Sequence, residues 1–426
     1  MKKLLLLIAL LCAFAHGAWA QDYDVWDGVT KTRPQFYENY AGHSNIIVIN
    51  TAAEMAYINE HWDDPSGFVS GKDFYELDYY LNHDINMYAG VDCYWTPLNS
   101  GAGDEYSFNK TFYGNGHTIY VHIYNLSSDN QGLFSRIGRK GKVQDLHVTG
   151  EMYIGSSDYV GGIASTNHGI IRNCHSSLYI ECGGYNQSTN SEKVGGLVGQ
   201  SFAESIIENC EMSGKMVMYA EEEKVGGIVG RSEKGIVRGC RMSGDIECRK
   251  ASWVGGIVGL NEDGTVQNCW MSGNVSYEST SSVDAEMIGG ITGKNGGFYK
   301  IALTTFCCMT GNVTCNGDDV GGIIGDNYAD VSHCTFYGTV NSTHAQDNKY
   351  VGNTNNESDL YDTFNQSEYD AALAAGHTLY AKSIKYTYDI NVTTVGQGSL
   401  TVSAGGENNV PGARKGQEVK IGRAHV

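Results

Sequence analysis

Cysteine offers the most chemistry of any residue type in this chain, because thiols can bind metals, form disulfides or act as nucleophiles. The chain has 426 residues and 12 cysteines, and six of the cysteines recur at intervals of 27 to 38 residues. None of them belongs to a Cys-x-x-Cys pair of the kind typical of zinc sites. The spacing predicts one cysteine per repeat, stacked as a buried structural ladder: Cys174, Cys210, Cys240, Cys269, Cys307 and Cys334.

A second interpretation of these cysteines stays open. Stacked repeats would bring equivalent Cα atoms to about 4.8 Å, which lies within the range that a disulfide bridges. The Cys307-Cys308 pair also invites comparison with a metal site. One thiol per repeat does not supply the clustered ligands that a metal needs, so we expect neither a metal nor a cofactor.

Paired carboxylates would indicate glycoside hydrolysis, which needs two carboxyl groups at a fixed separation. In a repeat protein they would come from equivalent positions of neighbouring repeats, and the sequence reveals no such alignment. The acidic residues fall mainly in segments that we expect to be loops: Glu221–Glu223, Glu262-Asp263, Asp284 with Glu286, and Asp318-Asp319. No Asp-x-Asp-x-Asp-Gly calcium loop is present. We interpret these carboxylates as a solvated acidic rim.

Other catalytic signatures are missing as well. There is no His-Glu-x-x-His zinc peptidase motif. The segment Gly230–Gly235 is one residue too long for a nucleophile elbow, and Gly289–Lys294 is one residue short of a phosphate-binding loop. We therefore expect no catalytic residues and no enzymatic activity in this stretch.

Tyrosine supplies the positive evidence for binding. The chain has 28 tyrosines, many of them between Tyr23 and Tyr124, and others in expected loops at Tyr185, Tyr219 and Tyr328. Exposed aromatic rings beside Asn and Asp suit stacking against sugars or contacts with proteins. The alternative is that the N-terminal tyrosines pack within a cap that covers an open core.

Charge and glycine content narrow the class of protein. The chain carries 29 Lys+Arg against 48 Asp+Glu, a formal net charge of −19, which repels phosphate backbones and excludes nucleic acid as a partner. It contains 55 Gly but only 4 Pro, and 41% of its residues are hydrophobic. This composition predicts a folded protein with many tight turns between strands.

These residues are positioned by an internal repeat. Val-Gly-Gly-(Ile/Leu) or its Ile variant begins at six positions, separated by 34, 31, 29, 34 and 32 residues: Val160, Val194, Val225, Val254, Ile288 and Val320. About fifteen residues later comes Asn-Cys or a variant of it, and then Met-Ser-Gly or Met-Thr-Gly in four of the units.

Each unit contains three short β-capable pieces between turns, and a single unit cannot bury its apolar side. The sequence therefore predicts an all-β, right-handed parallel β-solenoid with coils of about thirty residues and strands about 4.8 Å apart. The variable segments are expected to be its loops: Gly183–Glu192, Tyr219–Lys224 and Ser276–Glu286.

The run Val-Gly-Gly-Ile-Val-Gly, then Gly-x-(Ile/Val)-x-Asn-Cys, then Met-Ser-Gly resembles the GLUG-motif repeats of large surface proteins. These repeats are common in Bacteroidetes and are also attached to some bacterial immunoglobulin A peptidases. The resemblance covers roughly Trp26 to Lys382, and Tyr386 to Lys420 is similar to the opening of divergent internalin-type B repeats. It implies a surface or adhesin-like protein with no defined ligand.

The N-terminal end predicts export. Residues 1–20 form a signal peptide, with Lys2 and Lys3 at its start and Ala18-Trp19-Ala20 as the cleavage site. A lipoprotein signal would instead use Cys12, but the preceding residue is not small. No other run approaches the ~18 apolar residues that span a bilayer, so we expect a cell-surface, outer-membrane or extracellular location.

The remaining boundaries follow from changes in pattern. We expect an N-terminal cap over 21–110, the solenoid over 111–350, a C-terminal cap over 351–384 and a truncated small β module over 385–420. Thr51 and Glu54 form a capping box that begins a helix at Ala52–Trp62. A second short helix is expected at Glu368–Ala375. Residues 421–426 match the translation of a sequencing adaptor and are left out of the fold.

The sequence thus predicts an exported, adhesin-like binding stalk that presents its loops to a glycan or protein ligand. Two alternatives remain: a polysaccharide-degrading β-helix enzyme, and a non-catalytic spacer for a catalytic domain further along the gene. The sequence leaves the oligomeric state open.

Overall fold

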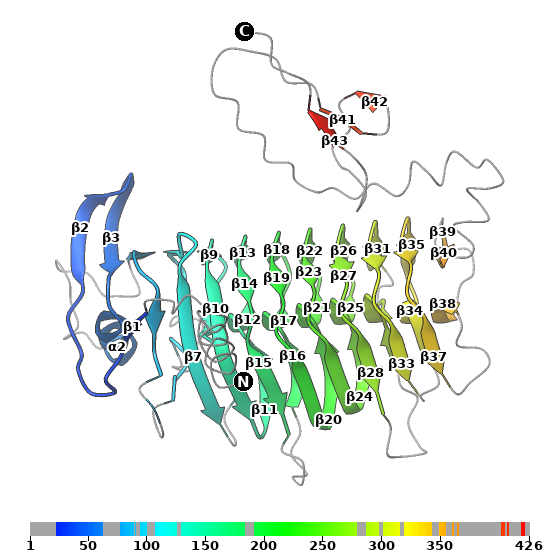
Figure 1. Cartoon of the computed structure of the whole chain (residues 1–426), viewed down its shortest axis with the longest axis horizontal. Helices are drawn as coiled ribbons and strands as arrows, with labels where there is room; N and C mark the ends of the chain where they lie inside the picture. Colours follow the sequence, from blue (N-terminus) through cyan, green and yellow to red (C-terminus); the bar gives the residue numbers. More distant parts are fainter. Residues whose placement is uncertain are drawn as a thin grey trace, which may run out of the picture.

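The computed structural model is a parallel β-solenoid in which successive coils stack along one long axis (Figure 1). It describes these residues: 23–62, 77–88, 90, 94–99, 107–125, 129–183, 191–278, 287–297, 301–315, 319–342, 349–354, 360–361, 364–365, 402–404, 407–408 and 419–421. The predicted fold class, a nearly all-β solenoid with a short helix at its N-terminal end, is confirmed.

One side of the solenoid is a sheet to which each coil adds one short strand. Over the described ranges this sheet has 12 strands: β2 Gln35–Tyr40, β3 His43–Ile49, β4 Asp78–Leu81, β6 Thr111–Tyr113, β9 Lys142–Gln144, β13 Ile170–Arg172, β18 Ile206–Glu208, β22 Ile236–Arg238, β26 Thr265–Gln267, β31 Leu303–Thr305, β35 Asp330–Ser332 and β39 Leu360–Tyr361. All neighbours in it are parallel except β2 and β3. In the three-residue strands of this sheet the middle residue points into the core, as Ile171, Ile207 and Val237 do.

A second side, which we call the long face, is formed by the strands that follow the Met-Ser-Gly signature and their counterparts in earlier coils. These strands are β7 Thr118–Asn125, β10 His147–Ile154, β15 Tyr179–Cys182, β20 Met216–Gly226, β24 Ile246–Gly255, β28 Val275–Tyr277, β33 Val313–Cys315 and β37 Val340–Ser342. They are parallel and in register. Alternation along each strand buries one set of side chains and turns the other set outward.

The Val-Gly-Gly signature makes a tight bend between two strands of the same coil, which we call the glycine corner. Its first arm is formed by β11 Ser157–Gly161, β16 Ser191–Gly195, the ends of β20 and β24, and β29 Met287–Gly289. Its second arm is formed by β12 Ala164–Asn167, β17 Val198–Ser201, β21 Val229–Glu233, β25 Val258–Glu262 and β30 Thr292–Asn295, while β34 Asp319–Asn327 spans both arms.

Close packing explains why both corner positions are glycine. A Cβ on Gly226 would overlap the carbonyl oxygen of Val229, and a Cβ on Gly227 would lie 2.7 Å from Cγ of Met242. Met242 belongs to the Met-Ser-Gly signature, so the two sequence signatures of a coil pack against each other across its interior.

The Asn-Cys signature marks a turn with left-handed backbone. The residue before each ladder cysteine has a positive φ, as at Asn173 (52°), Asn209 (54°) and Gly239 (63°). Glycine and asparagine tolerate this region best, which explains the repeated asparagine. Phe306 and His333 occupy the same position in later coils, and their rings stack at 4.6 Å.

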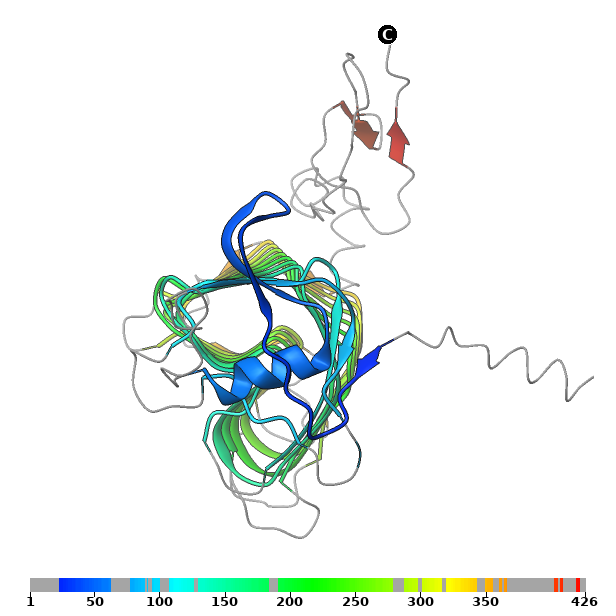
Figure 2. The same ribbon diagram turned by 90° about the vertical axis from the view of Figure 1, so that its left-hand side faces the viewer.

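The N-terminal end of the solenoid is covered by helix α2, Ala52–Glu60, which lies across the end of the coils (Figure 2). The predicted capping box is present: Thr51 accepts from the backbone N–H of Glu54, and Glu54 accepts from the N–H of Thr51. The helix ends two residues before the predicted Trp62, whose ring is nevertheless buried against Tyr79. Parallel pairing already includes Ile46–Ile49, within the segment predicted as the cap.

Two loop predictions are corrected by the structure. Tyr219–Lys224 lies inside the continuous strand β20, which absorbs the extra length through a register shift between Met218 and Glu221. Ser276 and Tyr277, the first two residues of the predicted loop Ser276–Glu286, belong to strand β28 Val275–Tyr277, and residues 279–286 of that loop lie outside the described residues. These segments are extended because each lies over a strand of the preceding coil, a constraint that composition does not reveal.

The C-terminal predictions are only partly covered. The predicted helix at Glu368–Ala375 and the strand at Tyr386–Val392 lie outside the described residues. Three antiparallel strands are present near the end: β41 Val402–Ala404, β42 Glu407–Asn408 and β43 Val419–Ile421. Among the described residues, no helix is long and apolar enough to cross a membrane.

Gly226→Ala should lower the free energy of unfolding by about 2 kcal/mol, because the added methyl group overlaps backbone that two coils hold in place. Gly42→Asn is the control: Gly42 has open space around its Cα and a φ of 85°, which asparagine tolerates. Urea denaturation followed by circular dichroism measures both. Equal stability of the two variants would contradict the corner's role.

Candidate ligand-binding surface

The six predicted cysteines all lie in the turns after the strands of the 12-stranded sheet, and all six are buried and unbridged. Each thiol donates to the carbonyl oxygen two residues before it; for example, Cys174 Sγ lies 3.2 Å from Arg172 O and Cys269 Sγ lies 3.3 Å from Gln267 O. Each also contacts a carbonyl of the preceding coil, as Cys269 does with Val237 O at 3.7 Å. The cysteines thus fill the turn, and their thiols add a second donor to carbonyls that already accept a backbone N–H, as Arg172 O does from Asp145 and Gln267 O does from Gly239.

Burial also makes these thiols poor nucleophiles. It raises the pKa of Cys210, Cys269 and Cys307 well above the ordinary value of a thiol, whereas burial raises that of Cys240 less than hydrogen bonds with the Cys210 and Cys269 thiols lower it. The reactive species is the thiolate, so a raised pKa suppresses both metal binding and oxidation. The ladder therefore contributes packing, and the chemistry of recognition must come from outward-facing residues.

The outward side chains of the long face gather aromatic rings near the N-terminal end. We call this set the aromatic surface: Tyr88, Tyr94, His122, Tyr124, Tyr153 and Tyr179. The last four are outward residues of β7, β10 and β15, and Tyr124 lies directly over Tyr153 in the register. Tyr88 and Tyr94 reach the same place from the chain segment before β7.

The rings form a continuous chain of contacts. Centroid distances are 4.7 Å between Tyr88 and His122, 5.2 Å between Tyr94 and Tyr124, and 5.8 Å between His122 and Tyr153. Tyr153 and Tyr179 are also 5.8 Å apart. Tyr94 and Tyr124 keep 39% and 45% of their surface exposed, whereas buried neighbours such as Ile123 keep none. This is an apolar but accessible patch on a rigid sheet.

Carboxylates lie between the rings and fix their polar ends. Glu151 is the register neighbour of both His122 and Tyr179, and the hydroxyl of Tyr179 donates to Glu181 Oε2 at 2.8 Å. Burial, followed by the nearby Glu151, raises the pKa of Tyr153; burial, followed by the bond to Glu181, raises that of Tyr179. These phenols stay neutral at physiological pH, so the surface offers ring faces beside hydrogen-bonding groups.

The sequence found part of this surface. Tyr88, Tyr94 and Tyr124 belong to the tyrosine-rich N-terminal segment, but others there pack internally, as the buried Tyr79 does. Tyr153 and Tyr179 were missed. Their signal is the alternation Tyr-x-His-x-Tyr beginning at Tyr120, which parallel stacking continues into the next coils.

Of the three tyrosines assigned to loops, Tyr219 lies on strand β20 in the middle of the long face, and Tyr328 lies at the glycine corner beside Lys294. Tyr185 is outside the described residues.

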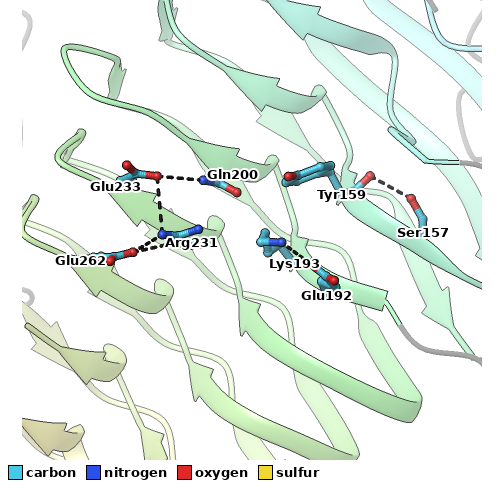
Figure 3. Close-up of polar contacts among 8 residues, drawn as sticks. All are labelled: Ser157, Tyr159, Glu192, Lys193, Gln200, Arg231, Glu233 and Glu262. Carbon is cyan, nitrogen blue, oxygen red and sulfur yellow. Dashed lines mark hydrogen bonds and ion pairs between the residues drawn. The ribbon is translucent and has the colours of Figure 1, made fainter. Parts of the chain in front are cut away.

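The glycine corner holds a second set of polar side chains, between its two arms (Figure 3). The ammonium group of Lys193 pairs with Glu192 and lies 4.6 Å from the ring centroid of Tyr159. The side chain of Lys193 is only 7% exposed although it points away from the core, because the two arms enclose it. A buried ammonium requires both of these partners.

The same corner corrects the expectation that no carboxylates align between coils. Glu233 and Glu262 are register partners on β21 and β25. Arg231 bridges them, with its Nε 2.7 Å from Glu262 and its guanidinium 3.5 Å from Glu233, and Gln200 donates to Glu233 at 3.2 Å. Both carboxylates are engaged by the same cation, so this pair links coils and does not present a free acid and base.

The corner ends in a buried carboxylate. Asp326 is fully buried beside Tyr328. Burial raises its pKa to about 6; Lys294 opposes the rise, nearby Asp319 adds to it, and a hydrogen bond with Tyr328 opposes it. Lys294 in turn lies between the rings of Trp253 and Tyr328, at 5.3 and 5.0 Å.

A stacked histidine pair could hold a metal only if its nitrogens were free to converge. His147 and His175 lie 4.4 Å apart, and their Nε2 atoms contact Ser177 and Ser213 at 2.8 and 2.7 Å. Burial and the neighbouring ring lower the pKa of His147 to about 4, so both imidazoles are neutral at physiological pH. No cluster of three or more metal-ligating side chains occurs within the described part of the chain.

Comparisons with known proteins add little about activity. No protein-family model matches this sequence. A stretch of 135 residues, 30% of this chain, is 33% identical to Halomucin of Haloquadratum walsbyi, and it spans about 1% of that protein. A solved structure of a candidate immunoglobulin A1 protease from Bacteroides ovatus aligns over 78% of this chain and 88% of its own, at 17% identity and a TM-score of 0.42. These similarities assign no activity to the chain.

The ten cysteines that the structure describes should be free thiols that react only after unfolding. Ellman's reagent added to native protein should leave them unlabelled, whereas the same titration in guanidinium should label all ten. Non-reducing peptide mass spectrometry gives an independent measure. A disulfide between two ladder cysteines of neighbouring coils would contradict this prediction.

The free energy of unfolding of the wild-type protein, relative to that of the Asp326→Asn variant, should be higher at pH 4 than at pH 7. The folded-state pKa of about 6 lies above the unfolded value of ~3.9, so the stabilising contribution is complete below pH ~4 and is lost as pH rises through 6. The difference amounts to about 3 kcal/mol. Urea denaturation of both proteins at pH 4 and pH 7 isolates this group from others, with exposed Asp330→Asn as control. A pH-independent difference between wild type and Asp326→Asn would refute it.

Proposed function

We propose that this protein is an exported, non-catalytic, adhesin-like binding protein of the GLUG-repeat type, whose solenoid displays a glycan-binding face. The observation that carries the proposal is the aromatic surface: neighbouring rings in mutual contact, partly exposed, on a sheet whose backbone is fixed by stacking. Ring faces pack against the apolar faces of sugars, while adjacent carboxylates accept from sugar hydroxyls.

Rigidity supports binding at this surface. Binding costs little conformational entropy at this face, because its rings already contact one another. Each coil also repeats similar groups at the strand spacing. Many weak contacts along one face then add through avidity. The net charge of −19 favours ligands without strong negative charge.

The enzymatic alternative receives no support from the carboxylates. Glu233 and Glu262 are joined by Arg231, and Glu181 accepts from Tyr179. The spacer alternative differs from the proposal in one measurable way, because a spacer binds no glycan.

Tyr124→Ala should weaken glycan binding about tenfold, which corresponds to roughly 1.4 kcal/mol for the loss of one exposed ring. A panel of host, matrix and plant glycans is first screened with the purified protein, and affinities are then measured by calorimetry. Tyr37→Ala, which removes a ring in contact with Tyr40 on the N-terminal hairpin, is the control and should bind normally.

Three outcomes separate the candidate functions. Binding that depends on Tyr124 supports the proposal. Release of reducing ends or unsaturated sugars from any member of the panel would show an enzyme. Absence of binding to the whole panel would leave the spacer as the function.

A further inference from the structure

The long face continues beyond the aromatic surface into an elongated groove with a volume of about 800 Å³. The groove crosses strands of five successive coils, from β20 to β37. Its floor is a register column of outward side chains that includes Glu247, Ser276, Thr314 and Asn341. Tyr219 and Arg249 form another column beside it.

A ladder of hydrogen bonds runs parallel to this groove, two residues earlier in the chain, at the residue just before each strand. The Asn274 amide donates to Asp245 at 3.0 Å, the Asn312 amide donates to Asn274 at 3.3 Å, and the Thr339 hydroxyl donates to Asn312 at 2.7 Å. All four side chains are exposed. Each coil therefore presents one amide, hydroxyl or carboxylate group at the equivalent position, and these groups form a row along the solenoid axis.

The repeat distance selects a kind of ligand. Parallel strands advance about 4.8 Å per coil, which is close to the advance of one sugar unit in an extended glycan. A linear polysaccharide lying along the axis meets the same hydrogen-bonding groups once per unit. A polymer lying along the strands would instead cross inward and outward positions of one coil and lose this match.

Charge selects among linear polysaccharides. Lys215 pairs with Glu247 at 2.7 Å, and the guanidinium of Arg249 lies 5.0 Å from the ring centroid of Tyr219. The cations at the groove are thus already engaged by groups of the protein, and Glu278 adds a further carboxylate to the lining. The described residues that line the groove therefore offer a polyanionic glycan no column of unpaired positive charge, so an uncharged polymer fits best.

We infer that the groove binds an uncharged linear polysaccharide running along the solenoid axis, with one sugar unit per coil from β20 to β37. This inference rests on the proposed function as a glycan-binding protein and deepens it, because it names the class and the direction of the ligand. It locates the contact on polar ladders, apart from the aromatic surface.

Calorimetry with graded oligomers of uncharged β-linked glucan, mannan and xylan tests the inference, with an oligouronate as the charged comparison. Affinity for one uncharged series should rise with length until the oligomer spans the coils of the groove, and then level off. The oligouronate should bind more weakly than the uncharged oligomer of equal length. Flat length dependence, or preference for the oligouronate, would overturn the inference.

Thr314→Trp fills the groove from an exposed outward position and should weaken binding of the longest oligomer at least tenfold. Asp330→Trp places the same bulk at an exposed position of the 12-stranded sheet and should leave binding unchanged. Asn312→Ala, a milder change, should weaken binding severalfold through the loss of its ladder bonds and serves if the tryptophan variant does not fold.

The two proposals fail in different ways. Loss of binding in Tyr124→Ala together with normal binding in Thr314→Trp and Asn312→Ala would overturn the groove and leave the aromatic surface as the glycan site. Failure of the wild-type protein to bind any glycan would overturn the proposed function itself.

Discussion

Backbone hydrogen bonding in a fixed parallel register is the interaction on which the whole structure depends. Each residue lies over its equivalent in the preceding coil, so a side chain suited to one coil must suit its neighbours about 4.8 Å away. Only side chains that tolerate a copy of themselves can form such columns. The buried asparagines show this most directly, because Asn261, Asn295 and Asn327 donate to one another in sequence at 2.9 Å.

The recurring signatures are local solutions to this constraint. Both glycines of the corner stand where a Cβ would overlap another coil or the methionine across the interior. The residue before each ladder cysteine, most often asparagine, adopts a left-handed backbone, and the cysteine then donates to the carbonyl oxygen two residues before it. One repeat unit therefore contains, in order, a corner, a turn and a strand for the long face.

The same register turns the surface into columns of chemistry. Aromatic rings contact one another from β7 to β15, and amides and hydroxyls hydrogen-bond to one another just before β24 and the long-face strands of later coils. Charged side chains at the glycine corner instead form ion pairs with one another, since Arg231 pairs with carboxylates of two neighbouring coils. Recognition is thereby concentrated on one face, while the corner strengthens the contact between coils.

The spacing of Val-Gly-Gly and Asn-Cys was sufficient by itself to determine the β-solenoid and the ladder positions of its cysteines, because a periodic sequence that cannot bury one unit alone must stack its units. The capping box at Thr51 and Glu54 likewise determined where the helix begins, since capping is a local interaction. Only the tertiary structure decided which outward residues meet. Tyr124 and Tyr153 are 29 residues apart in the sequence but adjacent in register, and Glu233 aligns with Glu262 because the intervening coil has the matching length. Pairings of this kind depend on the path length of each coil, which turns and bulges such as the one in β20 set, and no single segment encodes it.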